Sequence, residues 1–196
     1  MWVIFVSQRD GGTSWWLNRD MNSILITGIA GSGKSSVSRE LNKLGCKAYD
    51  LEGLEGMFKM IRKDTREDFK DYNNADMEKV KNGEWICDKN KLEELLNRQK
   101  ENVVFYCGIA SNHDELAPLF SKVFLLKASP DTIRKRLSNR EGTDDMGGTA
   151  ESREWVLNWK DWWETKQIER GVVVVEADGT SIEVAHKIID LLKSYT

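Results

Sequence analysis

The chain has 196 residues, of which 40% are hydrophobic and 31% are charged, and its formal net charge is −3 at pH 7. These values are typical of one globular domain that is large enough to bury a sizeable core. The net charge shows no excess of basic residues that would indicate a nucleic-acid-binding surface. No apolar run approaches the ~20 residues that a membrane helix needs. The cysteines, Cys46, Cys87 and Cys107, have no zinc spacing and are odd in number, which favours buried thiols and a cytoplasmic location.

Residues 1–20 differ in character from the rest of the chain. They include an apolar pentapeptide, Trp2–Val6, which is too short for a signal sequence and follows no basic residue. We expect a poorly ordered extension, with an added edge strand as the alternative. The folded domain is then expected to span residues 21–196.

The clearest motif runs from Gly28 to Ser35 and fits the pattern G-x-x-x-x-G-K-[ST]. An apolar run predicts a strand at residues 24–27, and a helical pattern follows the motif. A loop in this context binds phosphate through backbone N–H groups and the positive end of the helix dipole. The expected phosphate-binding residues are Gly28, Ala30, Gly31, Ser32, Gly33, Lys34, Ser35 and Ser36.

Two side chains of this motif have expected roles of their own. Lys34 would reach the β and γ phosphates of a nucleotide, and the Ser35 hydroxyl would ligate Mg²⁺. Without a nucleotide, we expect the Lys34 ammonium to face the solvent. The alternative for the whole segment is a Gly/Ser-rich turn that binds no ligand.

Four further apolar runs predict strands at residues 46–50, 102–107, 122–126 and 172–176. Helical patterns alternate with them, and helix starts are marked by Asp88, by Ser129 before a proline, and by Thr180 with Glu183. This alternation predicts an α/β fold with a doubly wound parallel sheet. The region 51–89 has no clear pattern, and it could hold substrate or form helices that cover one edge.

Acidic residues follow the second predicted strand, at the sheet edge where such folds bind ligands. Asp50 could hold Mg²⁺ through water or accept a proton from a substrate hydroxyl, and a plain helix cap is the alternative. Glu52 is the second candidate. The third predicted strand ends in Cys107 and Gly108, so it supplies no acid near the metal, and this favours Asp50.

Arginines border a polar, glycine-containing loop that follows residue 140. Arg136 and Arg140 lie one helical turn apart, and arginines above a γ-phosphate stabilise charge in phosphoryl transfer. Arg153 lies just beyond the loop and could join them. The alternative for each is a solvated surface charge. His113 has no other metal-ligating residue near it in sequence, and we expect it on the surface; the alternative is that it contacts substrate, because it follows Asn112 in the loop after the third predicted strand.

A tryptophan stripe marks the long helix predicted after this loop. Its members recur at helical spacing and are Trp155, Trp159, Trp162 and Trp163. We expect core packing, because four indoles on one helix would bury a large area against the sheet. A partner-binding or hinge face is the alternative.

With these motifs in place, the chain from residue 24 to residue 192 resembles the nucleoside-monophosphate-kinase-like P-loop kinases, which include adenylate, shikimate, gluconate and dephospho-coenzyme A kinases. The likeness rests on the segments 26–36, 123–140 and 174–179. The segments 47–51 and 105–112 are similar to those of small bacterial proteins described only as ATPases or kinases.

This resemblance implies a three-layer fold with five parallel strands in the order 2-3-1-4-5, and a short lid at about residues 138–153. It implies ATP as the phosphoryl donor. In such kinases the first lid arginine stacks on adenine, which maps to Arg136, and the next contacts phosphates, which maps to Arg140. The loop after the last strand touches adenine, which maps to Ala177–Thr180, with Asp178 and Gly179 as the expected contacts.

We therefore expect an ATP- and Mg²⁺-dependent kinase that acts as a monomer or homodimer on a small-molecule hydroxyl or a nucleotide phosphate. Its expected catalytic residues are Lys34, Asp50, Arg136 and Arg140, with Ser35 and Asp50 at the metal. The alternative is an ATPase or nucleotide-dependent switch that acts on a protein partner. A pocket lined by residues 51–89 beside Asp50 would favour the kinase, and an exposed tryptophan face would favour the switch. A GTPase is a third interpretation, but no N-K-x-D guanine-binding motif is present.

Overall fold

The computed structural model describes residues 23–99 and 103–194, so the predicted extension at residues 1–20 lies outside the described residues. A parallel sheet of five strands forms the centre, in the order β2-β5-β1-β6-β7. These strands are β1 (Ser23–Thr27), β2 (Lys47–Asp50), β5 (Val104–Cys107), β6 (Lys122–Lys127) and β7 (Val173–Glu176). Counted along the chain, this order is 2-3-1-4-5, which confirms the predicted fold class and topology.

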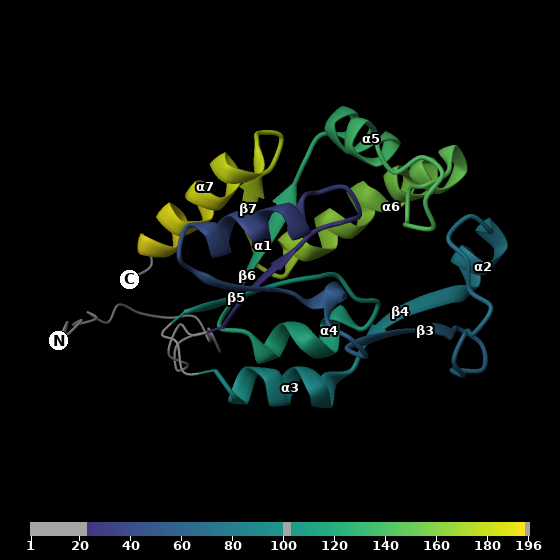
Figure 1. Cartoon of the computed structure of the whole chain (residues 1–196), viewed down its shortest axis with the longest axis horizontal. Helices are drawn as coiled ribbons and strands as arrows, with labels where there is room; N and C mark the ends of the chain where they lie inside the picture. Colours follow the sequence, from purple (N-terminus) through teal and green to yellow (C-terminus); the bar gives the residue numbers. More distant parts are fainter. Residues whose placement is uncertain (1–22, 100–102, 195–196) are drawn as a thin grey trace.

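Helices cover both faces of the sheet (Figure 1). They are α1 (Lys34–Lys43), α3 (Lys89–Asn97), α4 (His113–Leu116), α5 (Pro130–Ser138), α6 (Ala150–Glu169) and α7 (Ser181–Lys193), and η2 (Ala117–Leu119) is a short 3-10 turn. Neighbouring residues of β1 face two different cores: Ile24 and Ile26 pack in the core that includes α1 and α7, and Leu25 packs with Leu92 of α3. Each such fully buried side chain contributes ~1.5–3 kcal/mol to stability.

The predicted helix starts are confirmed where they matter for the site. The Ser129 hydroxyl accepts a hydrogen bond from the Thr132 N–H at the start of α5, and Thr180 and Glu183 form a reciprocal capping box at the start of α7. Each cap satisfies backbone groups that the first helical turn leaves unpaired. The caps fix the loops that precede α5 and α7, and these loops lie at the carboxyl ends of β6 and β7.

The region 51–89 forms a small unit that projects beyond the main sheet (Figure 1). It contains η1 (Leu51–Gly53), β3 (Phe58–Arg62), α2 (Met77–Asn82) and β4 (Gly83–Cys87). The two strands form an antiparallel hairpin in which Phe58 lies opposite Cys87. The interpretation of this region as helices that cover a sheet edge is therefore wrong. Asp88, directly after β4, caps α3 as predicted.

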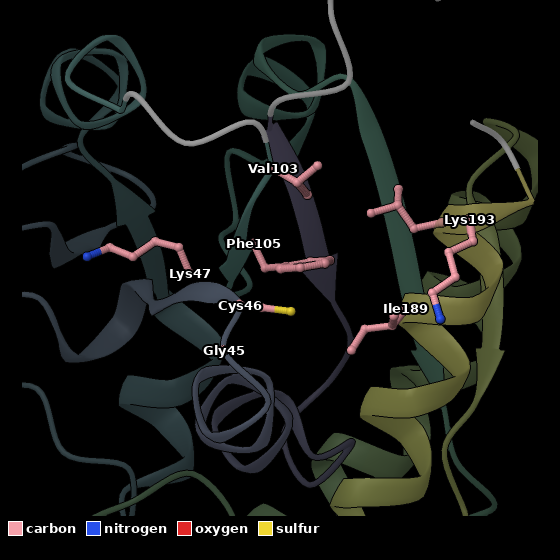
Figure 2. A pocket seen from close by; sticks show the side chains of 8 residues that line it. Gly45, Cys46, Lys47, Val103, Phe105, Ile189 and Lys193 are labelled. Atoms are coloured by element: carbon pink, nitrogen blue, oxygen red, sulfur yellow. The ribbon is translucent and has the colours of Figure 1, made fainter. Parts of the chain in front are cut away.

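A groove with a volume of about 520 Å³ opens where β2 and β5 begin (Figure 2). Its lining residues are Gly45, Cys46, Lys47, Val103, Phe105, Ile189, Leu192 and Lys193. The lining includes no acid, and the groove lies at the opposite end of the sheet from the phosphate-binding motif. In the described part of the chain, no helix is long and apolar enough to cross a membrane.

Candidate active site

The loop between β1 and α1 has the tight curvature that its sequence predicts. Gly31 and Gly33 adopt φ values of +82° and +108°, which side chains of L-residues rarely allow. A Cβ at Gly31 would lie 3.0 Å from Cγ of Leu137, so glycine also lets α5 approach the loop closely. The loop is thus held between its own strand and helix and the helix that carries Arg136 and Arg140.

Lys34 folds back over this loop instead of facing the solvent, so that expectation is wrong. Its side chain is only 9% exposed, and Nζ lies 3.6 Å from Oε1 of Glu52. Nζ also donates hydrogen bonds to the carbonyl oxygens of Gly28 (2.9 Å) and Ile29 (3.4 Å). A buried ammonium needs such partners because desolvation without them is costly. The phosphates of a nucleotide would compete with Glu52 for this charge.

Arg136 joins the phosphate-binding loop to the loop after β7. Its Nη1 donates to the carbonyls of Gly31 (3.4 Å) and Ser32 (3.1 Å), and its Nη2 donates to those of Ala177 (2.8 Å) and Gly179 (3.0 Å). Burial lowers the pKa of this guanidinium from its ordinary value. The side chain therefore holds two loops in register, a role that spacing along α5 does not reveal.

Asp178 and Gly179 lie in the second of these loops. Oδ1 of Asp178 accepts hydrogen bonds from the backbone N–H and the hydroxyl of Ser129, each at 2.8 Å. Hydrogen bonds from Thr132 and Ser129 lower the pKa of Asp178 to about 2. Asp178 is thus ionised at neutral pH and ties the loop after β7 to the start of α5.

Two cavities meet beside the loop. The first, called the P-loop cavity, has a volume of about 730 Å³. Its lining consists of residues 31–37, Arg136, Asn139, Arg140, residues 177–181, Glu183 and Val184. The second, called the hairpin cavity, has a volume of about 790 Å³ and lies between η1, the β3–β4 hairpin, α4, the lid and α6. Three residues, Lys34, Ser35 and Arg140, line both.

The two candidate acids lie in different surroundings. Asp50 of β2 lies opposite Cys107 of the neighbouring strand β5. Its Oδ1 is buried without a hydrogen-bond partner, and the residue lines neither cavity. Glu52 lines the hairpin cavity, and its Oε1 accepts a hydrogen bond of 3.2 Å from the Ile109 N–H. Burial, with the nearby Asp50 charge, raises the pKa of Cys107 to about 12, which keeps this thiol neutral. Glu52 is therefore the acid of this pair that reaches the cavity.

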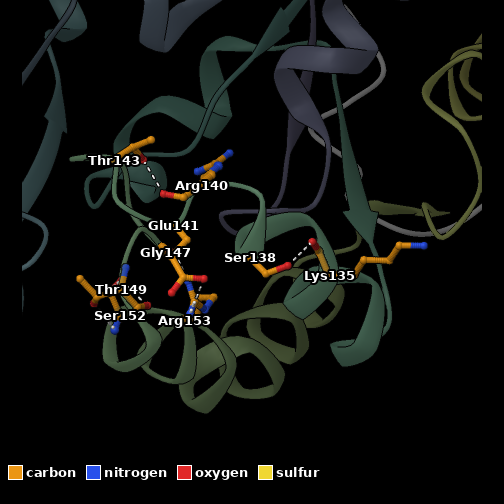
Figure 3. A network of polar contacts seen from close by, with 9 residues as sticks. All are labelled: Lys135, Ser138, Arg140, Glu141, Thr143, Gly147, Thr149, Ser152 and Arg153. Atoms are coloured by element: carbon orange, nitrogen blue, oxygen red, sulfur yellow. Dashed lines mark hydrogen bonds and ion pairs between the residues drawn. The ribbon is translucent and has the colours of Figure 1, made fainter.

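The lid between α5 and α6 is organised around its own arginines (Figure 3). Arg140 donates to the Met146 carbonyl at 3.0 Å, and Arg153 donates to the Gly147 carbonyl at 3.2 Å. Thr149 and Ser152 form a capping box that starts α6. Arg140 lines both cavities and Arg153 lines neither, so the fold brings only the first of these two arginines to the junction.

Two expectations about aromatic residues need correction. His113 is buried, with 5% of its surface exposed, and it lines the hairpin cavity. All members of the tryptophan stripe line the same cavity, and only Trp163 is fully part of the core, whereas Trp162 is 58% exposed. The helical face that carries these tryptophans lines a cavity whose other side is formed by the β3–β4 hairpin. Helical spacing cannot predict this arrangement, because the hairpin is distant from α6 in the sequence.

Ser35 and Asp50 carry oxygen donors suited to Mg²⁺. Ser35 lines both cavities, whereas Asp50, with the unpartnered Oδ1 described above, lines neither. Hydroxyl and carboxylate oxygens fit this hard cation. No group of three or more His, Cys, Asp or Glu side chains among the described residues could hold a metal. An ion at this position would therefore also need the oxygens of a bound phosphate.

Solved structures of several kinases have a similar fold. A shikimate kinase from Acinetobacter baumannii in complex with shikimate has a TM-score of 0.58 and 18% identity, covering 90% of this chain and 95% of that chain. A shikimate kinase from Bacteroides thetaiotaomicron has a TM-score of 0.53 and 19% identity, covering 88% and 98%. A deoxyadenosine kinase from M. mycoides with bound dATP has a TM-score of 0.55 and 16% identity, covering 87% and 99%. At these identities the likeness establishes the fold.

The five-stranded parallel sheet and the phosphate-binding loop between β1 and α1 define a P-loop fold. The sequence matches the family described as "AAA domain" over residues 24–157, which is more than half of the chain, and the chain belongs to this family. Comparison with curated proteins gave no match.

Proposed function

We propose that the protein is an ATP-dependent kinase that transfers the γ-phosphoryl group of Mg-ATP to a hydroxyl of a small molecule. The observation that carries this proposal is the meeting of two cavities at Lys34, Ser35 and Arg140. The P-loop cavity would hold the nucleotide, and the hairpin cavity would hold the acceptor. The fold that the chain shares with shikimate and deoxyadenosine kinases supports this assignment.

In the proposed reaction, the acceptor oxygen attacks the γ-phosphorus and forms a new O–P bond. The bond between the γ-phosphorus and the β–γ bridging oxygen breaks, and ADP leaves with the electron pair. The acceptor proton passes to the Glu52 carboxylate, which is freed when the phosphates draw the Lys34 ammonium away. Lys34 and Arg140 then stabilise the charge on the transferring group.

The metal assignment is part of the same proposal. Ser35 and Asp50 would hold Mg²⁺, Asp50 acting through bound water. When bound, the ion neutralises charge on the β and γ phosphate oxygens. In this proposal Asp50 holds the metal ion and Glu52 accepts the proton, whereas the sequence alone could assign both roles to one carboxylate.

The lining of the hairpin cavity favours a kinase over a switch that acts on a protein partner. Residues of the region 51–89 line it, among them Met60, Tyr72 and Trp85. A nucleotide switch without an acceptor needs no second cavity beside its γ-phosphate. The tryptophan stripe lines this cavity too, and only Trp162 in it is largely exposed.

Single-turnover γ-phosphoryl transfer across a Mg²⁺ titration tests the proposal with two variants. Glu52→Gln keeps the shape of the side chain but loses its basicity, so transfer should fall by about 10²–10⁴-fold at every Mg²⁺ concentration. Asp50→Asn should lose activity mainly at low Mg²⁺ and recover as the ion is raised. Glu55→Gln is the matched control, because Glu55 is exposed and lines neither cavity.

The pattern across the variants decides the assignment. A Glu52→Gln variant that transfers phosphoryl at the parent rate would remove Glu52 as the proton acceptor. Asp50→Asn activity that stays low at saturating Mg²⁺ would contradict a metal role for Asp50. ATP hydrolysis that no added alcohol accelerates or redirects would favour the switch.

A further inference from the structure

We propose that Asn74 is a positioning residue, which holds the lid against the unit formed by residues 51–89 and thereby keeps Arg140 at the junction of the two cavities. This unit is called the hairpin unit below. The inference rests on the proposed function, because it is there that Arg140 acts on the transferred phosphoryl group. It gives a catalytic consequence to a residue that lines the hairpin cavity but does not reach the P-loop cavity.

The first observation is a direct contact between the hairpin unit and the lid. Nδ2 of Asn74 donates a hydrogen bond of 2.7 Å to the backbone carbonyl of Asp144, which lies 70 residues further along the chain. Among the described residues, no other hydrogen bond or ion pair joins residues 51–89 to residues 138–153. Because the acceptor is a main-chain carbonyl, the contact depends on the side chain of Asn74 alone.

A second hydrogen bond orients the amide of Asn74. Its Oδ1 accepts a hydrogen bond of 2.8 Å from the hydroxyl of Tyr72. Burial raises the pKa of Tyr72 to about 12, so this hydroxyl keeps its proton at neutral pH and donates. An amide that accepts through Oδ1 has only Nδ2 left for the carbonyl of Asp144. Tyr72 therefore decides which end of the amide faces the lid.

The hairpin unit is itself anchored to the main sheet. In the loop after β5, the Ser111 N–H donates to the Trp85 carbonyl at 2.7 Å, and the Ser111 hydroxyl accepts from the Trp85 N–H at 3.0 Å. The side chain of Asn112 accepts from the Cys87 N–H at 3.1 Å and donates to the Cys87 carbonyl at 3.0 Å. These bonds fix β4 at the edge of the main sheet, so Asn74 reaches the lid from an anchored unit.

The lid connects Asp144 to Arg140 over a short path. The Thr143 N–H and hydroxyl donate to the Arg140 carbonyl at 3.0 Å and 2.9 Å (Figure 3). The Arg140 guanidinium in turn donates to the Met146 carbonyl at 3.0 Å. Asp144 lies between Thr143 and Met146 in the sequence, so a displacement of its backbone moves the groups that hold Arg140. In the described part of the chain Arg140 forms no ion pair, which leaves its charge for a phosphate.

The strength of the contact suits a reversible role. Asp144 is exposed and Asn74 is half-buried. One neutral hydrogen bond in such a place shifts an equilibrium by about two- to tenfold. The lid is therefore in equilibrium between an attached form, with Arg140 at the junction, and a detached form. A phosphate that binds Arg140 favours the attached form, and attachment strengthens that binding by the same factor.

Amide hydrogen exchange of the full chain, followed by mass spectrometry, tests the contact directly. The amides of Gly142, Thr143 and Gly148 are hydrogen-bonded within the lid. In Asn74→Ala they should exchange about two- to tenfold faster than in the parent, with no change in the central sheet. Asn82→Ala is the matched control and should exchange like the parent, because Asn82 is exposed on the same unit and lines neither cavity.

The kinetics of ATP hydrolysis separate positioning from a merely structural role. Water serves as the acceptor in this assay, so no small-molecule acceptor needs to be known. Asn74→Ala should lower kcat by about two- to tenfold and leave KM for ATP within about twofold. In an Arg140→Ala background the same substitution should lower kcat no further, because its effect passes through Arg140. A merely structural role would lower kcat by the same factor in both backgrounds.

The outcomes distinguish this inference from the proposed function. Lid exchange in Asn74→Ala at the parent rate would overturn the inference, and so would equal losses of kcat in the two backgrounds. Tyr72→Phe should act in the same direction as Asn74→Ala, and it provides the test if Asn74→Ala does not fold. A parent protein that does not turn over ATP would contradict the proposed function and the catalytic consequence, whereas the exchange data would still decide whether Asn74 holds the lid.

Discussion

Replacing Arg136 by methionine should destabilise the fold and weaken nucleotide binding together. Three of its four carbonyl contacts are at or below 3.1 Å, namely those to Ser32, Ala177 and Gly179. Hydrogen bonds from a charged donor contribute ~1.5–3 kcal/mol each, and water can replace part of this at a half-buried site. At about 1 kcal/mol each, the loss is about 3 kcal/mol, or about 6–12 °C in Tm for a chain of this length.

Thermal unfolding and calorimetry with a non-hydrolysable ATP analogue measure both effects. The dissociation constant should rise about tenfold or more, because the two loops that line the P-loop cavity lose their common anchor. Arg134→Met is the matched control, since Arg134 lies on the same helix and, among the described residues, forms ion pairs with Asp131 and Glu154 at the surface. It should cost less than about 1 kcal/mol. An Arg136→Met variant with the same Tm as the Arg134→Met control would refute the structural role of Arg136.

Three further predictions concern single residues of the site. Lys34→Ala should abolish ATP turnover, as product formation will show, because no other described cation lies within salt-bridge distance of Glu52 beside the loop. Arg140→Ala should lower kcat far more than it raises KM for ATP, because its charge matters most during transfer, and steady-state kinetics with a change in KM alone would contradict this. The unfolding free energy should fall as the pH drops below 6.5, the ordinary pKa of His113, because its lowered pKa in the fold leaves the unfolded chain with more bound protons. Urea titrations at several pH values should show a smaller decrease in His113→Phe, and equal slopes would exclude His113 as the cause.

Local signals predicted the framework of this fold well. The motif from Gly28 to Ser35, the apolar strand runs and the caps at Ser129 and Thr180 each depend on residues close together in sequence. The parallel order of the strands then follows from the family resemblance and is confirmed. Arg140 lies two residues beyond the end of α5, a helix that starts where the Ser129 cap predicts, and it lines both cavities.

The remaining features depend on contacts between distant segments. The partners of Arg136 are backbone carbonyls, which have no sequence signature. His113 is buried because α6 packs over it with Trp163, and its ring lies 6.1 Å from that indole. The choice between Asp50 and Glu52 depends on how the chain turns after β2, and η1 turns Glu52 toward the cavity. The hairpin within residues 51–89 lacked a sequence signal because its strands mix charged and apolar residues without strict alternation.

The fate of the γ-phosphate of ATP tests most directly whether a phosphoryl group is transferred between the two cavities. ATP with a radiolabelled γ-phosphate is incubated with the protein and a panel of nucleosides, sugars and other small alcohols, and the products are separated by chromatography. We expect the label to appear on an acceptor hydroxyl with the parent protein and not with Lys34→Ala. Label that appears only as inorganic phosphate, at a rate that no alcohol changes, would contradict it.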